Sequence, residues 1–308
     1  MTMMDRTARA GAPVARVDAV EKLEAIAYAL RRDVVEMVNL AGSGHVGGSL
    51  SSAEIVVTLY WHVLRIDPSR PDWAERDRLV LSKGHCAPIV YAALARRGYF
   101  DPAILASFRK TGSILQGHPD WTKTPGLDMT SGSLGQGLSV GLGLALAARQ
   151  THRGYQVYVL MSDGEMQEGM TWEAAMASRH YRAGNLTVLV DRNNLQVDGF
   201  VDQVMGIEPL LDKWRAFGWN AVELDGHEVP ALLEAFERRR AGAEENPWVF
   251  ICRTVKGKGV SFMENVMEWH SGMLTAEQYA QALAELRPRT GSFDVTGWPE
   301  RFEEDGGD

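Results

Sequence analysis

Apolar positions between residues 155 and 190 change their period twice, which predicts a strand, a helix and a second strand. Residues 155–161 alternate as in a β-strand and end in Ser162-Asp163-Gly164-Glu165. Residues 168–181 have the apolar spacing of a helix, and residues 186–190 form a short β-rich run that precedes Asp191-Arg192-Asn193. We interpret this segment as one βαβ unit with two parallel strands.

The same patterns extend over most of the chain and predict one α/β domain. A helix over 18–40, with Asp18 as its N-cap and Glu21 three residues later, has apolar residues at helical spacing. Further helices are predicted over 52–64, 87–97 and 134–148, and strands over 78–82, 220–223 (with 224–227 after it) and 248–254. This alternation predicts a doubly wound, mostly parallel sheet with helices on both faces. We expect one domain over 18–302, with flexible tails at 1–17 and 303–308.

Two polar side chains follow the strands of the βαβ unit and predict a magnesium site. Asp163 and Asn193 stand roughly thirty positions apart. Because parallel strands end at one sheet edge about 4.8 Å apart, these side chains can converge on one ion. Carboxylate, amide and carbonyl oxygens suit Mg²⁺, and Gly164 would let a phosphate approach the backbone. An Asp-Gly pair by itself indicates only a turn; the asparagines at this spacing favour a metal-diphosphate site.

Composition excludes several classes of function. The chain has 308 residues, 45% of them hydrophobic, and a formal net charge of -8, which disfavours nucleic-acid binding. Residues 1–16 lack a continuous apolar core, and no run approaches the roughly 18 apolar residues of a membrane span, so we expect a cytoplasmic protein. The two cysteines, Cys86 and Cys252, are far apart and indicate neither a disulfide framework nor a zinc site.

The acid-glycine turn and the asparagine pair resemble the thiamine-diphosphate fingerprint, written Gly-Asp-Gly, about thirty residues and Asn-Asn. Ser162 stands where the first glycine is usual. Further motifs narrow the resemblance to transketolases, occur in the family's order and span roughly residues 20 to 272. They are Ser43-Gly44-His45, Leu81-Ser82-Lys83-Gly84-His85, Gly117-His118-Pro119, Ser131-Gly132-Ser133-Leu134-Gly135-Gln136-Gly137 and Val255-Lys256-Gly257-Lys258-Gly259.

The resemblance implies a role for each matching residue. Asp163, Asn193 and the main-chain carbonyl of Leu195 would bind Mg²⁺, or another divalent cation such as Ca²⁺ or Mn²⁺. A loop histidine considered alone favours a structural role, but four in the family's register favour the active site. The cofactor would contact His85, Gly132, Ser133, Leu134, Asp163, Gly164, Asn193 and His270, while the catalytic histidines would be His45, His118 and His270. Ser133 replaces the proline of long transketolases, and His270 is separated from the following glycine by Ser271.

The resemblance implies an N-terminal subunit of a split transketolase. Such a subunit, with thiamine diphosphate and Mg²⁺, would transfer a two-carbon ketol unit from a ketose donor to an aldose acceptor. The partner would be a C-terminal subunit that grips the pyrimidine and carries the activating glutamate, in an expected α₂β₂ complex. The donor and acceptor stay open between pentose phosphates and branched or sulfonated sugars. No membrane or nucleic-acid partner is expected.

Several alternatives remain open at this point. A 2-oxo acid dehydrogenase α subunit is also a split thiamine-diphosphate half, but the motifs at 81–85 and 255–259 do not favour it. The others are a single-chain 1-deoxyxylulose-phosphate synthase and a non-catalytic subunit that holds cofactor or regulates a relative. Glu168 and Glu173 match an acidic network between paired active sites, or are a solvated first helical turn. The small residues of the 134–148 helix predict close packing, against either a second subunit or its own sheet.

Overall fold

A five-stranded sheet organises the chain in the computed structural model, which describes residues 16–17, 19–242 and 245–287. Its strands are β1 (Arg78–Leu81), β2 (Val157–Ser162), β3 (Leu186–Arg192), β4 (Asn220–Asp225) and β5 (Trp248–Arg253). The order is β1-β2-β3-β5-β4, and every neighbouring pair is parallel. The predicted α/β class and the βαβ unit are confirmed.

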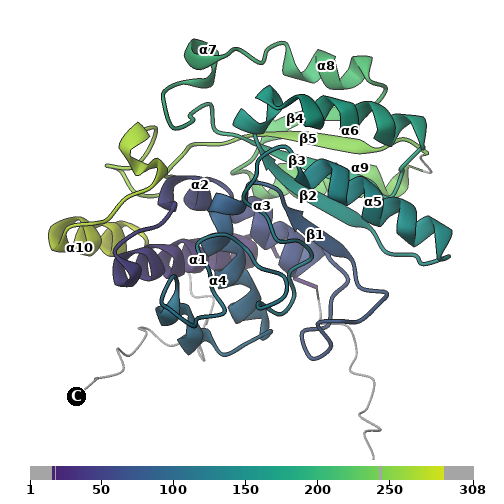
Figure 1. The fold of residues 1–308 in the computed structure, drawn as a ribbon. Helices are drawn as coiled ribbons and strands as arrows, with labels where there is room; N and C mark the ends of the chain where they lie inside the picture. The colour runs from purple at the N-terminus through teal and green to yellow at the C-terminus, as the bar shows by residue number, and fades with distance from the viewer. Residues whose placement is uncertain (1–15, 18, 243–244, 288–308) are drawn as a thin grey trace, which may run out of the picture.

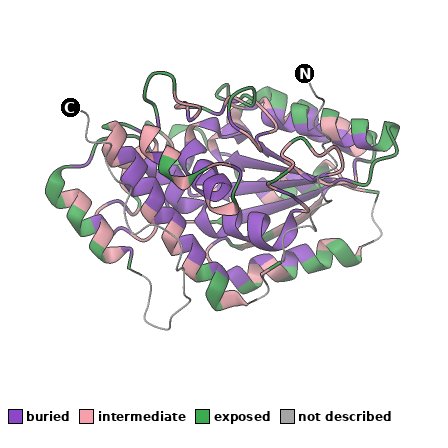
Figure 2. Cartoon of the chain, turned by 90° about the horizontal axis from the view of Figure 1, so that it is seen from below, coloured by how far each residue is buried: buried purple, intermediate pink, exposed green. Residues whose placement is uncertain are grey.

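Helices cover both faces of this sheet, so the strands are buried (Figure 1; Figure 2). Along β2, Tyr158 and Leu160 pack into one apolar cluster, while Val157, Val159 and Met161 pack into the other. The strand is therefore apolar throughout, as expected for a parallel sheet covered on both sides. The first cluster includes α1 (Val20–Ala41), α3 (Ala53–Thr58), α4 (Ala87–Arg97) and α9 (Val229–Ala241); the second includes α5 (Gly137–Gln150), α6 (Gly169–His180) and α8 (Leu210–Ala216).

The remaining elements are short or peripheral. They are α2 (Val46–Ser51), α7 (Val201–Val204), α10 (Ala276–Glu285), a π-helical turn at Leu59–Val63 and 3₁₀ turns at Gly84–Cys86, Pro102–Ser107, Gly164–Gln167 and Met267–His270. None of the described helices is both long and apolar enough to cross a membrane. The predicted tails, 1–17 and 303–308, lie outside the described residues except for Arg16 and Val17, and the predicted cap Asp18 also lies outside them. Helix α1 begins at Val20, with Ala19 at the N-cap position.

The single helix predicted over 52–64 is wrong. The chain turns helical already at Val46 and breaks at Ser52, and its last turn is π-helical. The hydroxyls of Ser51 and Ser52 bond to the carbonyl of Gly48 and also donate to Asp191, 2.6 and 3.2 Å away. Side-chain bonds of this kind compete with regular helical pairing, and here they tie the break to a buried carboxylate.

The helix predicted over 134–148 begins later, at Gly137, and ends at Gln150. Gly135 has a φ of 79°, and its N–H donates to Glu165 Oε1 at 3.0 Å. The first residues of the predicted helix therefore remain in a loop that faces the carboxyl ends of the strands. Both packing alternatives keep support, because a Cβ at Gly141 would lie 2.5 Å from Val159 Cγ2, whereas Gly143 faces open space.

Candidate functional site

A cavity of about 270 Å³ lies at the carboxyl ends of β1, β2, β3 and β5. In a doubly wound sheet this edge is the usual place for ligands. Loops far apart in sequence form its wall: Gly48, Lys83, His85, His118, Gly132, Leu134, Ser162, Asp163, Gly164, Gln167, Glu168, Asn193, Leu195, Gln196, Val197, Asp198, Lys256 and His270. Most of the residues predicted for the cofactor and metal are among them.

Asp163 is buried where β2 ends. Its Oδ1 accepts a hydrogen bond from the Gly164 N–H at 2.8 Å, and its Oδ2 accepts one from the Asn194 N–H at 2.6 Å and one from Arg192 Nη1 at 3.2 Å. Burial and the nearby charge of Asp191 raise the pKa of this carboxyl, although Arg192 acts in the opposite direction. A buried carboxyl in this position gains from a further positive charge, such as a divalent cation.

Asn193 holds its amide beside Asp163 through bonds at both ends. Its Nδ2 donates to Asp191 Oδ2 at 3.0 Å, and its Oδ1 accepts from the Leu195 N–H at 3.1 Å. Asn194 takes a left-handed conformation, with φ of 62°, and turns the chain there. The Leu195 carbonyl accepts from Lys256 Nζ at 2.7 Å and keeps a second lone pair.

These residues fit a magnesium-diphosphate group. Asp163, Asn193 and Leu195 bring three kinds of hard oxygen to one cavity, as Mg²⁺ requires. A Cβ at Gly164 would meet only Gln196 Cβ, at 4.0 Å, so the backbone is open to a ligand. Across the described parts of the chain, no group of three or more His, Cys, Asp or Glu side chains could hold a metal; the set here contains one carboxylate only.

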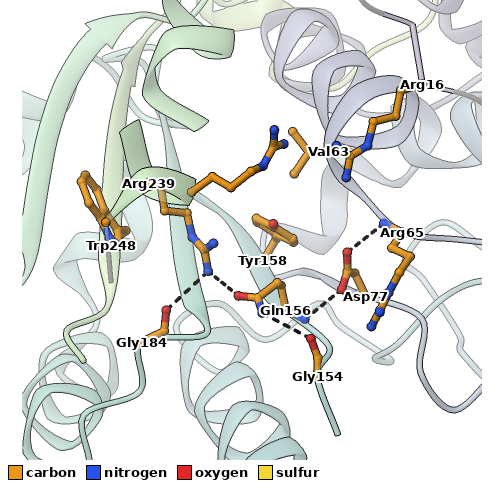
Figure 3. A pocket seen from close by; sticks show the side chains of 12 residues that line it. Arg16, Val63, Arg65, Asp77, Gly154, Gln156, Tyr158, Gly184, Arg239 and Trp248 are labelled. Atoms are coloured by element: carbon orange, nitrogen blue, oxygen red, sulfur yellow. Dashed lines mark hydrogen bonds between the residues drawn. The ribbon is translucent and has the colours of Figure 1, made fainter. Parts of the chain in front are cut away.

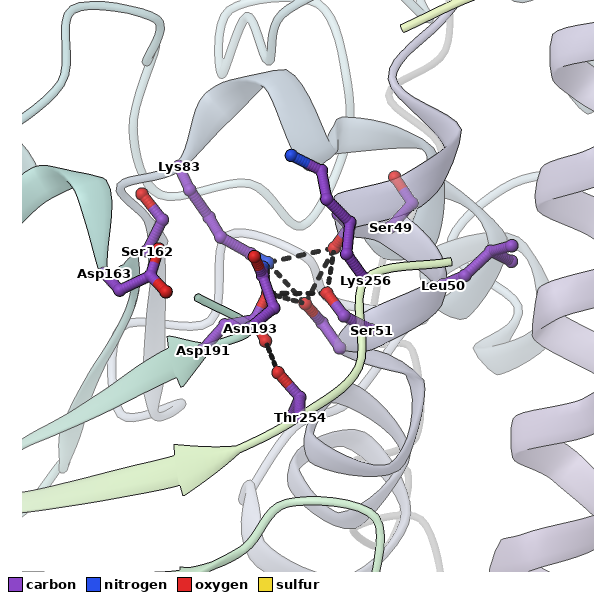
Figure 4. A network of polar contacts seen from close by, with 12 residues as sticks. Ser49, Leu50, Ser51, Lys83, Ser162, Asp163, Asp191, Asn193, Thr254 and Lys256 are labelled. Carbon is purple, nitrogen blue, oxygen red and sulfur yellow. Dashed lines mark hydrogen bonds and ion pairs between the residues drawn. The ribbon is translucent and has the colours of Figure 1, made fainter. Parts of the chain in front are cut away.

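A buried ion pair supports this wall, and motif spacing alone did not predict it. Lys83 Nζ donates to Asp191 Oδ2, to Ser52 Oγ and to the Gly48 carbonyl, and Thr254 also donates to Asp191 (Figure 4). Burial acts against both charges, yet mutual attraction raises the pKa of Lys83 and lowers that of Asp191. The available signal was a lysine and an aspartate at the ends of apolar strands.

Glu165 is a second buried acid to which sequence reasoning assigned no role. Its carboxylate accepts hydrogen bonds from Ser82 Oγ, from the N–H groups of Gly135 and Ser162, and from Ser162 Oγ. Burial raises the pKa of Glu165 despite these donors. The residue links three loops of the site, and its place in the Ser-Asp-Gly-Glu turn was the available signal.

The structure brings the four predicted histidines together. The ring centroid of His45 lies 5.3 Å from that of His85, 5.9 Å from that of His118 and 5.3 Å from that of His270. The rings of His85 and His270 stack at 5.3 Å. His45 does not line the cavity itself and lies behind the three rings that do.

Burial and neighbouring positive groups keep these imidazoles neutral. The pKa of His45 falls to about 4 through burial and the charges of His118, Arg109 and Lys256. Burial and Lys256 lower the pKa of His270 to about 3, and the pKa values of His85 and His118 are also lowered. Lys256 Nζ lies 2.9 Å from His270 Nδ1, and burial lowers the pKa of Lys256 to about 8. Neutral imidazoles can accept protons from hydroxyl groups.

Other predicted residues lie apart from this cluster. Ser133 is exposed and does not line the cavity, although Gly132 and Leu134 do. Glu168 lines it, whereas Glu173 is exposed on α6. Cys86 is buried, and burial raises the pKa of its thiol to about 11, which suits packing rather than nucleophilic chemistry.

His227 is a conformational support rather than a member of the cluster. Its Nε2 accepts from the Val255 N–H at 2.8 Å, and its Nδ1 lies 2.9 Å from Glu54 Oε2. Glu54 is paired through both oxygens with the buried Arg31. This chain of contacts fixes the residue before Lys256.

Comparisons with known proteins agree with the site. Residues 22–296 match the family model for the transketolase thiamine diphosphate binding domain. The chain is 42% identical over 270 residues to one named subunit of the apulose-4-phosphate transketolase of Phocaeicola vulgatus, covering 88% of this chain and 95% of that protein. It is 44% identical over 260 residues to the 6-deoxy-6-sulfo-D-fructose transketolase subunit SqwG of a Clostridium species, covering 84% and 94%.

Full-length enzymes match over part of their length. Human transketolase is 36% identical over 270 residues, which are 86% of this chain and 42% of that protein. The crystal structure of Campylobacter jejuni transketolase superposes with a TM-score of 0.82 and 30% identity, covering 87% of this chain and 43% of that one. This chain thus spans less than half of these enzymes. By sequence and by fold, it belongs to the transketolase family and contains that family's thiamine-diphosphate-binding domain.

Proposed function

We propose that this chain is the N-terminal, cofactor-holding subunit of a transketolase that moves a two-carbon ketol unit from a ketose donor to an aldose acceptor. The observation that carries the proposal is the convergence of four neutral histidines on the cavity that contains Asp163 and Asn193. Thiamine diphosphate, when bound, would supply the nucleophilic carbon and the electron sink for this chemistry. We assign residues 18–302 to this one domain, with tails at 1–17 and 303–308.

Each predicted residue has a proposed task. Asp163, Asn193 and the carbonyl of Leu195 would hold the divalent cation, and Gly164 would face the diphosphate. His85, Gly132, Ser133, Leu134 and His270 would contact the rest of the cofactor. His45, His118 and His270 would bind donor and acceptor hydroxyls and relay their protons, because neutral imidazole is the form that accepts a proton.

A second polypeptide would complete the active site. Two relatives that this chain covers almost completely are named as subunits, which supports a separate C-terminal partner. We propose that the partner grips the pyrimidine, supplies the activating glutamate and forms an α₂β₂ complex in the cytoplasm. Other split thiamine-diphosphate enzymes are less well supported, because these relatives carry transketolase names.

The test is ketol transfer from hydroxypyruvate to a panel of aldoses, with thiamine diphosphate and Mg²⁺. This chain alone is compared with this chain plus the product of its neighbouring gene. Activity only in the mixture is expected. If the complex forms and binds cofactor yet transfers nothing to any acceptor, the transketolase assignment is refuted and a regulatory role replaces it.

The same assay identifies the substrate class. The two relatives named as subunits carry the names of different sugars, apulose 4-phosphate and 6-deoxy-6-sulfo-D-fructose. The donor panel therefore includes these two sugars and a pentose phosphate such as xylulose 5-phosphate. The donor with the highest kcat/KM defines the physiological class.

A further inference from the structure

A second cavity, of about 390 Å³, lies at the opposite edge of the sheet. Gln156 precedes β2, Gly184 lies just before β3, and Trp248 begins β5, so this cavity faces the amino ends of the strands. A six-residue strand spans about 20 Å, which separates it from the thiamine-diphosphate site. We call it the arginine cavity, because Arg16, Arg65, Arg239 and Arg240 line it together with Val63, Asp77, Gly154, Gln156, Tyr158, Gly184, Gly242 and Trp248 (Figure 3).

The arginines place more positive charge here than the wall neutralises. Among the described residues, Arg16 has no hydrogen bond or ion pair, and Arg240 pairs only with the exposed Glu237. Asp77 is the sole carboxylate of the lining, and its oxygens already accept the N–H groups of Arg65 and Gln156, both at 2.8 Å. In a chain of net charge -8, this concentration of guanidinium groups calls for an anionic partner.

One of these arginines is held in position. Arg239 Nε donates to Thr187 Oγ1 at 2.5 Å, and its Nη2 donates to Gln156 Oε1 at 2.6 Å and to the Gly184 carbonyl at 3.4 Å. Within the described structure, the Nη1 group makes no such bond. A guanidinium that is anchored along one edge and open along the other is ready to bind an oxyanion with little loss of entropy.

Tyr158 provides an independent indication of a ligand. The residue is only 4% exposed, yet within the described parts of the chain its hydroxyl has no hydrogen-bond partner. Figure 3 shows it between Arg239 and Arg16. Burial raises the pKa of this hydroxyl to about 12, Arg239 acts against that rise and so do Arg240 and Arg16, so three arginine charges surround one neutral donor.

We propose that the arginine cavity binds the phosphoryl group of a small phosphorylated metabolite. Arg16, Arg239 and Arg240 would supply the charge, and the Tyr158 hydroxyl would supply a neutral donor. Guanidinium groups match phosphate geometry through paired N–H donors. The cavity exceeds the size of a bare phosphate, and Val63 and Trp248 offer apolar surface to the organic part.

Helix geometry offers a structural alternative for two of these residues. Arg238, Arg239 and Arg240 form the last turn of α9, where cations complement the helix dipole. Arg238 is exposed and lies outside the cavity lining. It is therefore a matched control, because it shares the helix end but not the cavity.

The test is calorimetric titration of the full chain with inorganic phosphate at constant ionic strength. Four variants are compared: the double variant Arg16→Gln/Arg240→Gln, Tyr158→Phe, Arg238→Gln, and Lys256→Gln, which weakens phosphate binding at the thiamine-diphosphate site. We expect the double variant to lose at least about tenfold in affinity for the arginine cavity and Tyr158→Phe to lose less, while Arg238→Gln and Lys256→Gln retain it. Circular dichroism confirms that each variant is folded.

Two results would overturn the proposal. One is phosphate binding that survives in the double variant and disappears in Lys256→Gln, which would place all binding at the thiamine-diphosphate site. The other is the absence of saturable binding to the unaltered chain. A second titration compares glucose 6-phosphate and AMP with inorganic phosphate; tighter binding of either supports a metabolite, and equal binding refutes the metabolite and leaves free phosphate as the ligand.

Discussion

Individual side chains at the site owe their properties to burial beside charges of the same sign. His45 loses basicity because it is packed among other imidazoles and near Lys256. Asp163 gains a proton more readily than a surface aspartate because it is buried beside Asp191. The residues that the motifs marked therefore differ from ordinary surface residues in measurable ways.

The first prediction concerns the pH dependence of stability. The pKa of His45 is about 4 in the folded chain and about 6.5 unfolded, so the unfolded state binds more protons between these values. Its contribution to the free energy of unfolding is therefore present above pH 6.5 and is lost as pH falls toward 4. His45→Gln should show a shallower loss between pH 7 and pH 5 in urea denaturation than the unaltered chain.

The control for this prediction is His180→Gln, on the exposed end of α6, which should keep the original slope. An unchanged slope in His45→Gln would show that the cluster does not couple folding to protonation.

The second prediction concerns the metal site. Asp163→Ala should weaken Mg²⁺-dependent binding of thiamine diphosphate to the assembled complex by at least about 100-fold, because it removes the only carboxylate among the proposed ligands. Asp202→Ala is the matched control, since Asp202 also contacts Arg192, at 3.4 Å, but is exposed. Calorimetry with and without Mg²⁺ measures the effect, and an unaltered affinity in Asp163→Ala would refute the metal assignment.

Helices and loops place these side chains through close packing and buried contacts. Helix α5 approaches the sheet closely at Gly141, and the opposite side of the helix is open at Gly143. The loop after β4 is fixed by His227, which joins Glu54 of α3 to the backbone of Val255. Both features can be tested with changes that leave the site residues in place.

The third prediction uses two glycines of α5. Gly141→Ala should lower the free energy of unfolding by about 1–3 kcal/mol, because the new Cβ would lie 2.5 Å from Val159 Cγ2. Gly143→Ala should raise it by about 0.5–1 kcal/mol, because alanine favours the helix and the space is open. Urea denaturation of the isolated chain compares them, and equal effects would contradict the packing described here.

The fourth prediction concerns His227. His227→Leu leaves the buried Glu54 and the Val255 N–H each without one partner, so we expect a loss of about 1–3 kcal/mol in the free energy of unfolding. His180→Leu, which changes an exposed histidine, should have little effect. If the two variants unfold alike, His227 does not support this loop.

Across the whole molecule, apolar side chains remain exposed on the outer side of α5 and α6. Val140 is 37% exposed, Met170 37% and Met176 58%. Exposed apolar groups that lie together commonly mark an interaction surface. We expect the proposed complex to cover this face.

The fifth prediction follows from that face. Met176→Glu should weaken association with the C-terminal partner by at least about tenfold, because a charge would be buried at the contact. Met273→Glu is the control, since Met273 is 68% exposed and lies on a different part of the chain. Sedimentation velocity measures association, and undiminished assembly in Met176→Glu would exclude this face.

Local patterns in the sequence determine the elements that surround the metal site. Strand and helix periods are properties of short segments, so β2, α6 and β3 could be recognised without knowing what they pack against. The parallel βαβ geometry then brings Asp163 and Asn193 to one edge. For the same reason, the motif histidines could be placed in loops at that edge.

Contacts between distant segments decide the remainder. The break at Ser52 depends on Lys83 and Asp191, which are far away in the chain, so the helical period at 52–64 could not reveal it. The arginine cavity combines residues from 16 to 248 and has no local pattern. Hydrogen bonds and charges act through space, and their partners are known only when the fold has brought the segments together.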